Sequence, residues 1–102
     1  MVNDNKTAAY LIGHIRVKDP VKWAEYCSKV PTTLIQWQAE LVLRGTRAFI
    51  LEGAYPHGDT VVIRFPDAET IRQWHASAAY QALVPLREQA ADVTLVGFEG
   101  GR

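Results

Sequence analysis

The chain has 102 residues, of which 48% are hydrophobic, and its 11 Lys and Arg balance 11 Asp and Glu, which gives zero formal net charge. This composition predicts one soluble globular domain, excludes a disordered chain, and argues against nucleic acid or an anionic membrane as partner, because both attract basic surfaces. A lone Cys27 excludes an intrachain disulfide, and with neither a basic leader nor a long apolar run in the sequence we expect a cytoplasmic protein without a signal peptide or membrane span.

The first third of the chain predicts a strand followed by a helix. Residues 8–17 are rich in β-branched and aromatic side chains and stop at Lys18-Asp19-Pro20. Asp19 can cap a helix whose first position is Pro20. Spacings of three and four residues then predict one apolar helical stripe, which a proline at position 31 should kink. The stripe consists of Trp23, Cys27, Val30, Leu34 and Trp37.

The middle of the chain predicts three short strands. Residues 39–44 and 47–52 flank Gly45-Thr46, a pair suited to a tight hairpin turn. A loop at 53–59 then leads into a strand at 60–65, which is rich in β-branched residues.

The last third predicts a helical region followed by a closing strand. Asp67 caps a helix with Ala68, Ile71 and Trp74 on one side, and Ser77 begins a second helix. Pro85 should cost that second helix one backbone hydrogen bond. Its predicted stripe contains Tyr80, Leu83, Val84, Arg87 and Ala91. Residues 93–99 read as a strand before a short flexible tail.

The predicted order β-α-β-β-α-β is the ferredoxin-like pattern of α+β proteins, in one domain over residues 8–99 with flexible tails at 1–7 and 100–102. Two helices cover only one face of a sheet. The side chains predicted to face the helices are Leu11, Ile15, Val17, Val61, Ile63, Phe65, Val93 and Leu95. The opposite face would carry Tyr10, Ile12, His14, Arg16, Val62, Arg64, Thr94, Val96 and Phe98. This second face is too apolar for a solvated surface, so we expect a second copy of the chain to cover it.

Several segments together resemble a known family. They are Ala9–Ile12, Asp19-Pro20, Glu52-Gly53, Phe65-Pro66 and the element Trp74-His75-Ala76-Ser77-Ala78-Ala79-Tyr80-Gln81 followed by Arg87. On these residues nearly the whole chain resembles domain-of-unknown-function family 1330. The resemblance implies a ferredoxin-like fold assembled as a dimeric α/β barrel, as in cofactor-free monooxygenases, muconolactone isomerases and stress-response proteins, and it implies no particular activity. The chain differs from the common pattern in having Gln38-Ala39 where many members carry paired glycines, and His14 where an acidic residue is frequent.

The predicted open face carries the sharpest candidates for chemistry. His14 could exchange a proton near neutral pH, or could be a hydrogen-bonded core or interface residue. Arg64 could hold a carboxylate or an enolate, or could form a salt bridge across a dimer interface. We expect a cavity that prefers anions and is bounded by Tyr10, Ile12, Val62 and Trp74.

The helical candidates are Tyr80 and Arg87, which lie seven residues apart and would face one neighbour. They could line the mouth of a pocket or simply pack together. Trp74 could form a pocket wall or a core residue. We interpret Ser77 as a helix cap and not a nucleophile, because no nucleophile elbow surrounds it. The three histidines lack ligand-like spacing, and no phosphate loop or dinucleotide motif is present, so we expect neither a metal nor a cofactor.

Two functions therefore stay open. One is a cofactor-independent enzyme, of isomerase, lyase or monooxygenase type, acting on a small anionic or aromatic molecule with His14 as acid or base and Arg64 holding negative charge. The other is a non-catalytic small-molecule-binding or stress-related accessory protein. In both we expect a homodimer that buries Ile12, Val96 and Phe98 between its subunits.

Overall fold

The computed structural model describes residues 7–100, so the predicted flexible tails lie outside the described residues apart from Thr7 and Gly100. Its elements follow one another in the predicted order. They are β1 (Ala9–Val17), α1 (Pro20–Leu34), the 3₁₀ turn η1 (Ile35–Trp37), β2 (Glu40–Thr46), β3 (Asp59–Phe65), α2 (Ala68–Ala76), α3 (Ala78–Gln81), α4 (Val84–Ala90) and β4 (Ala91–Glu99).

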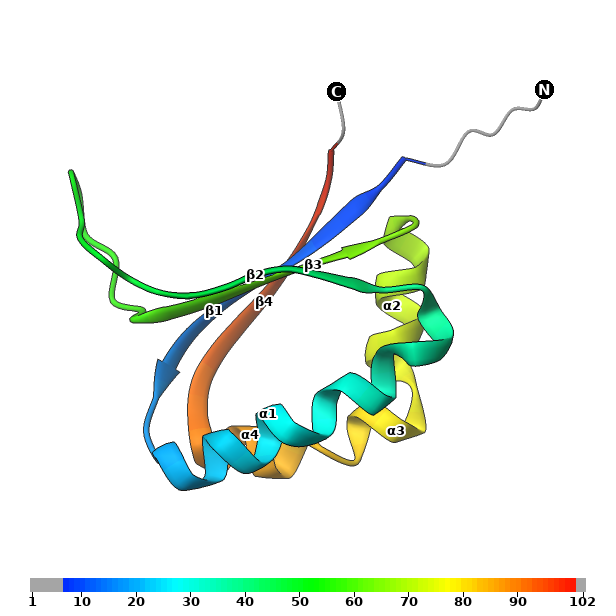
Figure 1. Cartoon of the computed structure of the whole chain (residues 1–102), viewed down its shortest axis with the longest axis horizontal. Helices are drawn as coiled ribbons and strands as arrows, with labels where there is room; N and C mark the ends of the chain where they lie inside the picture. The colour runs from blue at the N-terminus through cyan, green and yellow to red at the C-terminus, as the bar shows by residue number, and fades with distance from the viewer. Residues whose placement is uncertain (1–6, 101–102) are drawn as a thin grey trace.

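The four strands form one antiparallel sheet in the order β2-β3-β1-β4. The helices that connect β1 to β2 and β3 to β4 all lie on the same face of this sheet (Figure 1). This two-layer arrangement is the ferredoxin-like fold, and it confirms the predicted fold class. No helix among residues 7–100 has both the length and the apolar character to cross a bilayer.

Local capping explains where the helices begin. The carboxylate of Asp19 accepts hydrogen bonds from the backbone N–H groups of Val21 and Lys22, each at 3.1 Å, ahead of Pro20 in the first helical turn. Asp67 accepts from the backbone N–H of Thr70 at 2.7 Å and so starts α2. These contacts confirm both predicted caps.

The turn after η1 depends on a left-handed residue. Gln38 has φ 57° and ψ 33°, and among the described non-glycine residues it alone has a positive φ. This conformation ends η1 and redirects the chain into β2. The backbone at Gln38 thus adopts a conformation that glycine takes up more readily than glutamine.

The predicted hairpin around Gly45-Thr46 is wrong. Both residues belong to β2, which pairs along its length with β3. Pairing with β3 outweighs the local turn propensity of the pair, because strand assignments depend on the tertiary partner. Residues 47–58 instead project from the body of the protein as an irregular segment, closed at its base by a 2.7 Å hydrogen bond from Arg47 N–H to the Gly58 carbonyl (Figure 1).

The prediction that Pro85 costs a helix one backbone hydrogen bond is also wrong. The helix that was predicted to run past Pro85 stops after α3, and α4 begins afresh at Val84. Pro85 therefore occupies the first turn of α4, where a backbone N–H has no partner within the helix.

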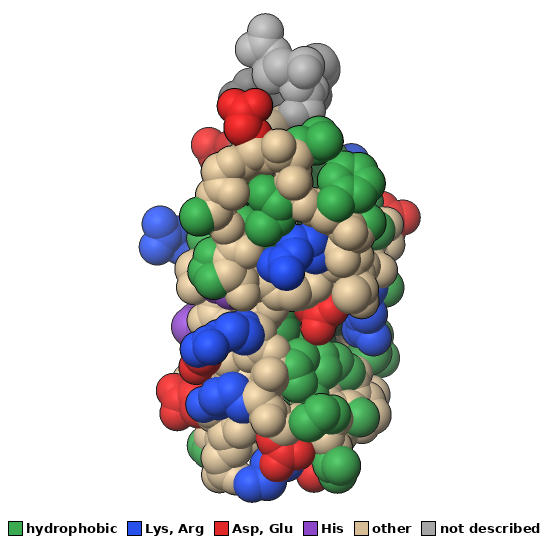
Figure 2. Space-filling view, turned by 90° about the vertical axis from the view of Figure 1, so that its left-hand side faces the viewer, with side chains coloured by type: hydrophobic (Ala, Val, Ile, Leu, Met, Phe, Trp, Pro, Cys, Tyr) green, Lys and Arg blue, Asp and Glu red, His purple; other side chains and the backbone are tan. Residues whose placement is uncertain are grey.

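The core lies between the helices and one face of the sheet, as predicted. Phe65, Trp74 and Tyr80 are its largest fully buried side chains, and Leu11 and Ile63 contribute from the central strands. No helix covers the other sheet face, where Tyr55 and His57 lie against His14 and Phe98 remains 50% exposed. The projecting segment carries two further exposed hydrophobic side chains, Phe49 and Leu51, which are 71% and 89% exposed. Seen from the side on which this segment projects, groups of hydrophobic side chains alternate with lysines and arginines (Figure 2).

Candidate functional site

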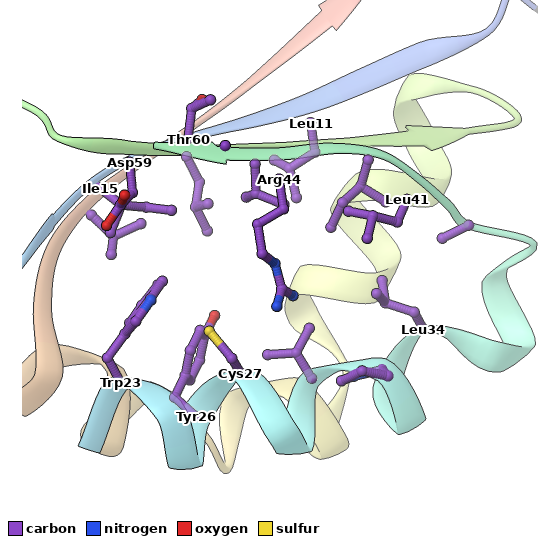
Figure 3. A pocket seen from close by; sticks show the side chains of 18 of the residues that line it. Leu11, Ile15, Trp23, Tyr26, Cys27, Leu34, Leu41, Arg44, Asp59 and Thr60 are labelled. Atoms are coloured by element: carbon purple, nitrogen blue, oxygen red, sulfur yellow. The ribbon is translucent and has the colours of Figure 1, made fainter. Parts of the chain in front are cut away.

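A pocket of about 650 Å³ lies between α1 and the sheet (Figure 3). It exists because α1 packs chiefly on α4 and not directly on the strands beneath it. Apolar side chains dominate its walls, including Leu11, Ile15, Trp23, Leu34, Leu41 and Trp74. The apolar stripe predicted for the first helix therefore lines a pocket, apart from Trp37, and its residues are only half-buried in the single chain.

Arg44 extends from β2 into this pocket, with its guanidinium directed across the cavity towards α1 (Figure 3). A bulge explains the direction. Leu41 is opposite Ile63 and Leu43 is opposite Val62, so β2 holds one extra residue, Val42, between them. Side chains on a regular strand alternate between faces, and one extra residue reverses the alternation beyond it. Both Leu41 and Arg44 consequently face the pocket, although their spacing in sequence would place them on opposite faces.

Arg44 has no charged partner among residues 7–100. Arg64 pairs with Glu40 at 3.5 Å and Arg16 pairs with Asp92. Arg44 forms no ion pair and no hydrogen bond with any residue in the described part of the chain. Asp59 also lines the pocket, but it lies further along the sheet, beside Ile15 and Thr60 (Figure 3).

Cys27 lies opposite Arg44 on the α1 side of the pocket (Figure 3). Burial raises the pKa of its thiol above the ordinary value, and Asp59 acts in the same direction. The positive charge of Arg44 opposes this rise in pKa, which shows that the guanidinium is close enough to affect the thiol. An anion beside Cys27 would therefore also be within the field of Arg44.

A buried hydrogen-bonded chain stands behind the pocket wall. Arg87 Nη1 donates to Tyr80 Oη at 2.8 Å, and the Tyr80 and Tyr26 hydroxyl oxygens are 2.8 Å apart. Beside them Trp74 Nε1 donates to Thr33 Oγ1 at 3.0 Å. Tyr26 and Trp74 line the pocket, whereas Tyr80 is fully buried behind them. Burial, the largest cause, holds the pKa of Tyr26 well above its usual range.

The structure gathers three of the six predicted site residues on the helix side of the sheet. Trp74 forms part of the pocket wall, and Arg87 contacts Tyr80 as their spacing predicted. The predicted grouping of Trp74 with Tyr10, Ile12 and Val62 does not occur in the single chain, because these three residues lie on strand positions that face away from the helices.

The other three predicted site residues, His14, Arg64 and Tyr10, lie on the open sheet face. His14 Nδ1 is 2.7 Å from the Tyr55 hydroxyl, and its ring centre is 5.7 Å from that of His57. Neither His14 nor Arg64 lines the pocket. Their predicted roles in catalysis and anion binding therefore concern a surface that only another molecule could enclose.

Ser77 is a helix cap, as predicted. Its hydroxyl oxygen accepts from the Tyr80 backbone N–H at 3.3 Å, and its hydroxyl donates to the Trp74 carbonyl at 2.7 Å. Across residues 7–100, no three His, Cys, Asp or Glu side chains lie close enough together to hold a metal ion.

Sequence reasoning missed Arg44 and Tyr26. The extra residue in β2 has no local signature, so strict alternation groups Arg44 with Glu40 and Val42, away from Leu41. Tyr26 did carry a signal, since Tyr26, Val30 and Thr33 share a helical face adjacent to the predicted stripe.

Comparison with known proteins agrees with this fold. The family described as a domain of unknown function, DUF1330, matches residues 8–101. A protein of unknown function from Rhodopseudomonas palustris, RPA0582, is 14% identical, with 98% of this chain and 87% of that chain covered and a TM-score of 0.81. No curated protein sequence matches the chain.

Two further solved structures share the fold at low identity. SnoaB, a cofactor-independent oxygenase from Streptomyces nogalater, is 10% identical over 94% of this chain and 95% of that chain, with a TM-score of 0.65. A dimeric ferredoxin-like protein of unknown function from Jannaschia is 9% identical over 91% of this chain and 99% of that chain, with a TM-score of 0.73. At such identities the likeness establishes the fold, and the function has to be argued from the site.

Proposed function

Because the chain belongs to the DUF1330 family of domains of unknown function, its activity must be inferred from its site, and we propose that the pocket binds a small aromatic anion held by Arg44. The observation that carries the proposal is the Arg44 guanidinium, which has no partner among the described residues and extends into a pocket with mostly apolar walls. Arg44 is exposed, so its donors are open to a carboxylate, which a guanidinium can bind through paired hydrogen bonds.

Size and lining support an aromatic ligand. The pocket volume, about 650 Å³, falls in the range of sites that hold small molecules. Trp23, Tyr26 and Trp74 offer flat apolar surfaces around it. Such surfaces pack well against a ring, while a single cation fixes its orientation.

The corresponding chemistry is that of a cofactor-independent enzyme. A cation beside a bound ring stabilises the negative charge that develops when the substrate loses a proton to form an enolate or a phenolate. SnoaB, a cofactor-independent oxygenase, has the same fold, so the fold is compatible with an enzyme that needs no cofactor. The alternative, a non-catalytic binding protein, would use the same pocket without turnover.

We further propose that two copies pair through the open sheet face. That face carries the half-buried Ile12 and Val96 and the exposed Phe98, and a dimeric ferredoxin-like relative has the same fold. In such a dimer the two sheets form an α/β barrel, and His14 and Arg64 become enclosed. Their predicted acid-base and anion-binding roles depend on that assembly.

The test compares benzoate with its neutral analogue benzamide by isothermal titration calorimetry. We expect the wild-type protein to bind benzoate more tightly than benzamide. In Arg44→Met the ratio of the two affinities should fall about tenfold, because a charged hydrogen bond is lost while most of the aliphatic side chain remains. Arg72→Met is the matched control, on α2 and outside the pocket, and should retain the preference. Equal binding by wild type and Arg44→Met would refute the proposal, and a loss in Arg64→Met alone would move the anion site to the open face.

A further inference from the structure

The hydroxyl groups of Tyr26, in the pocket wall, and Tyr80, behind it, carry two hydrogens but share only one hydrogen bond. Arg87 only donates, so Tyr80 Oη accepts from it at 2.8 Å. The two hydroxyl oxygens of Tyr80 and Tyr26 are 2.8 Å apart and share one hydrogen bond. Each hydroxyl carries one hydrogen, and no other acceptor among residues 7–100 receives either of them. One hydroxyl hydrogen is therefore unused.

Burial decides which hydrogen is unused. If Tyr26 donated to Tyr80, the Tyr80 hydrogen would be stranded in a fully buried position, which is costly. If Tyr80 donates to Tyr26, the unused hydrogen belongs to Tyr26, which is 8% exposed against 0% for Tyr80 and lines the pocket. There a ligand or water can accept it. The favoured sequence of donors is thus Arg87 to Tyr80, Tyr80 to Tyr26, and Tyr26 into the pocket.

The charge of Arg87 strengthens this donor. Hydrogen bonds in a chain polarise one another, and the first donor here is a guanidinium. Burial holds the pKa of Tyr26 well above its usual range, so the hydroxyl keeps its proton. Tyr26 is therefore suited to donate a hydrogen bond and unsuited to act as a base.

Tyr26 and Arg44 reach the pocket from different elements, α1 and β2. We propose that the pocket recognises an aromatic acid with two separated groups, an anionic group at Arg44 and a carbonyl oxygen that accepts a hydrogen bond from Tyr26. Tyr26 is then a substrate-binding residue, and Tyr80 and Arg87 are positioning residues. This inference rests on the proposed function and specifies its substrate class.

The arrangement has a chemical consequence. A hydrogen bond to a ketone oxygen stabilises the enolate that forms when the adjacent carbon loses a proton. The bond that breaks is the C–H bond beside the carbonyl, and its electron pair moves to the oxygen that Tyr26 contacts. The proton acceptor in this step would be a base on the substrate or in solution, since Tyr26 keeps its own proton.

The experiment uses pairs of ligands of similar shape, 3- and 4-acetylbenzoate against 3- and 4-isopropylbenzoate. Both members of a pair carry the carboxylate, and only the acetyl compounds have the acceptor. We expect the wild type to bind at least one acetyl isomer more tightly than its isopropyl counterpart. In Tyr26→Phe the ratio of these two affinities should fall about fivefold. Tyr10→Phe removes a hydroxyl on the opposite sheet face and should leave the preference intact.

An infrared spectrum of the bound acetyl group tests the same contact without relying on affinity. Its carbonyl band should move to lower wavenumber in the wild type, return towards the free value in Tyr26→Phe, and move less in Tyr80→Phe and Arg87→Met. A merely structural role for Tyr80 or Arg87 would leave the band of the bound ligand unchanged. A wild-type band that stays at the free value would by itself refute the inference, so this arm of the test does not depend on any variant folding.

The outcomes separate the two proposals. The role of Tyr26 would be refuted, and the anion site retained, by either of two results. In the first, all four acids bind in a way that depends on Arg44 but the acetyl compounds are not preferred. In the second, the acetyl preference and the band shift are both unchanged in Tyr26→Phe. Binding that is absent, or indifferent to Arg44→Met, would refute the anion site and the inference with it.

Discussion

Replacing Gln38 by glycine should stabilise the protein. Gln38 holds a left-handed conformation, φ 57° and ψ 33°, at the end of η1. For an L-residue this conformation costs about 1–2 kcal/mol, and glycine adopts it without that penalty. The Gln38 side chain is exposed and forms no hydrogen bond with the described residues, so its loss removes no contact that would offset the gain.

The net effect follows from two opposing contributions. Glycine has more freedom in the unfolded chain, which reduces the gain by about 0.5–1 kcal/mol. We therefore expect Gln38→Gly to increase the free energy of unfolding by about 0.5–1 kcal/mol. For a domain of this size, that corresponds to a rise in Tm of roughly 3–6 °C.

Urea unfolding followed by tryptophan fluorescence measures this change, at one fixed protein concentration because a dimer would make stability depend on concentration. The matched control is Gln36→Gly, the same substitution two positions earlier, where φ is negative. That control should lower stability by about 0.5–1 kcal/mol. If Gln38→Gly destabilised the protein as much as Gln36→Gly, the attribution of strain to Gln38 would be wrong.

Three further predictions concern the cap, the pocket thiol and the open sheet face. Ser77→Ala should lose about 1 kcal/mol of stability in urea unfolding while Ser77→Asp retains it, and equal stability of both variants would contradict the capping role. Cys27 should react with iodoacetamide at pH 8 more slowly than free cysteine, because burial raises the pKa of its thiol. The reaction should be slower still in Arg44→Met, which lacks the charge that lowers this pKa, and slower in the wild type when benzoate is saturating. If benzoate gave no protection, the ligand would bind elsewhere. Replacing Phe98 on the open sheet face by aspartate should shift equilibrium sedimentation at tens of micromolar towards monomer, whereas a wild-type protein that is already monomeric there would exclude the dimer.

The sequence predicted the fold well because the fold depends on signals that are local. The caps at Asp19, Asp67 and Ser77 use side chains that bond to backbone groups two or three residues away. Alternation along β1 likewise predicted which of its side chains enter the core.

The candidate site was harder to predict because it depends on how distant elements meet. Gly45-Thr46 has the composition of a turn, and only the pairing with β3 shows that it lies within a strand. The stripe on α1 predicted contact with apolar surface, but not that α1 would pack on α4 and leave a cavity above the sheet. Tyr80 and Arg87 were correctly paired, while their effect on Tyr26 requires the packing of α1 beside α3.

The bulge at Val42 makes the charge of the pocket depend on the number of residues in β2 as well as on their identity. A relative with one residue fewer at this point would keep its arginine and yet present it on the opposite face of the sheet. Edge strands such as β2 tolerate single insertions and deletions better than central strands, since only one neighbour must adjust. Members of the family could therefore gain or lose the cation by a single-codon deletion, and an alignment that shifts the gap along β2 would conceal the difference.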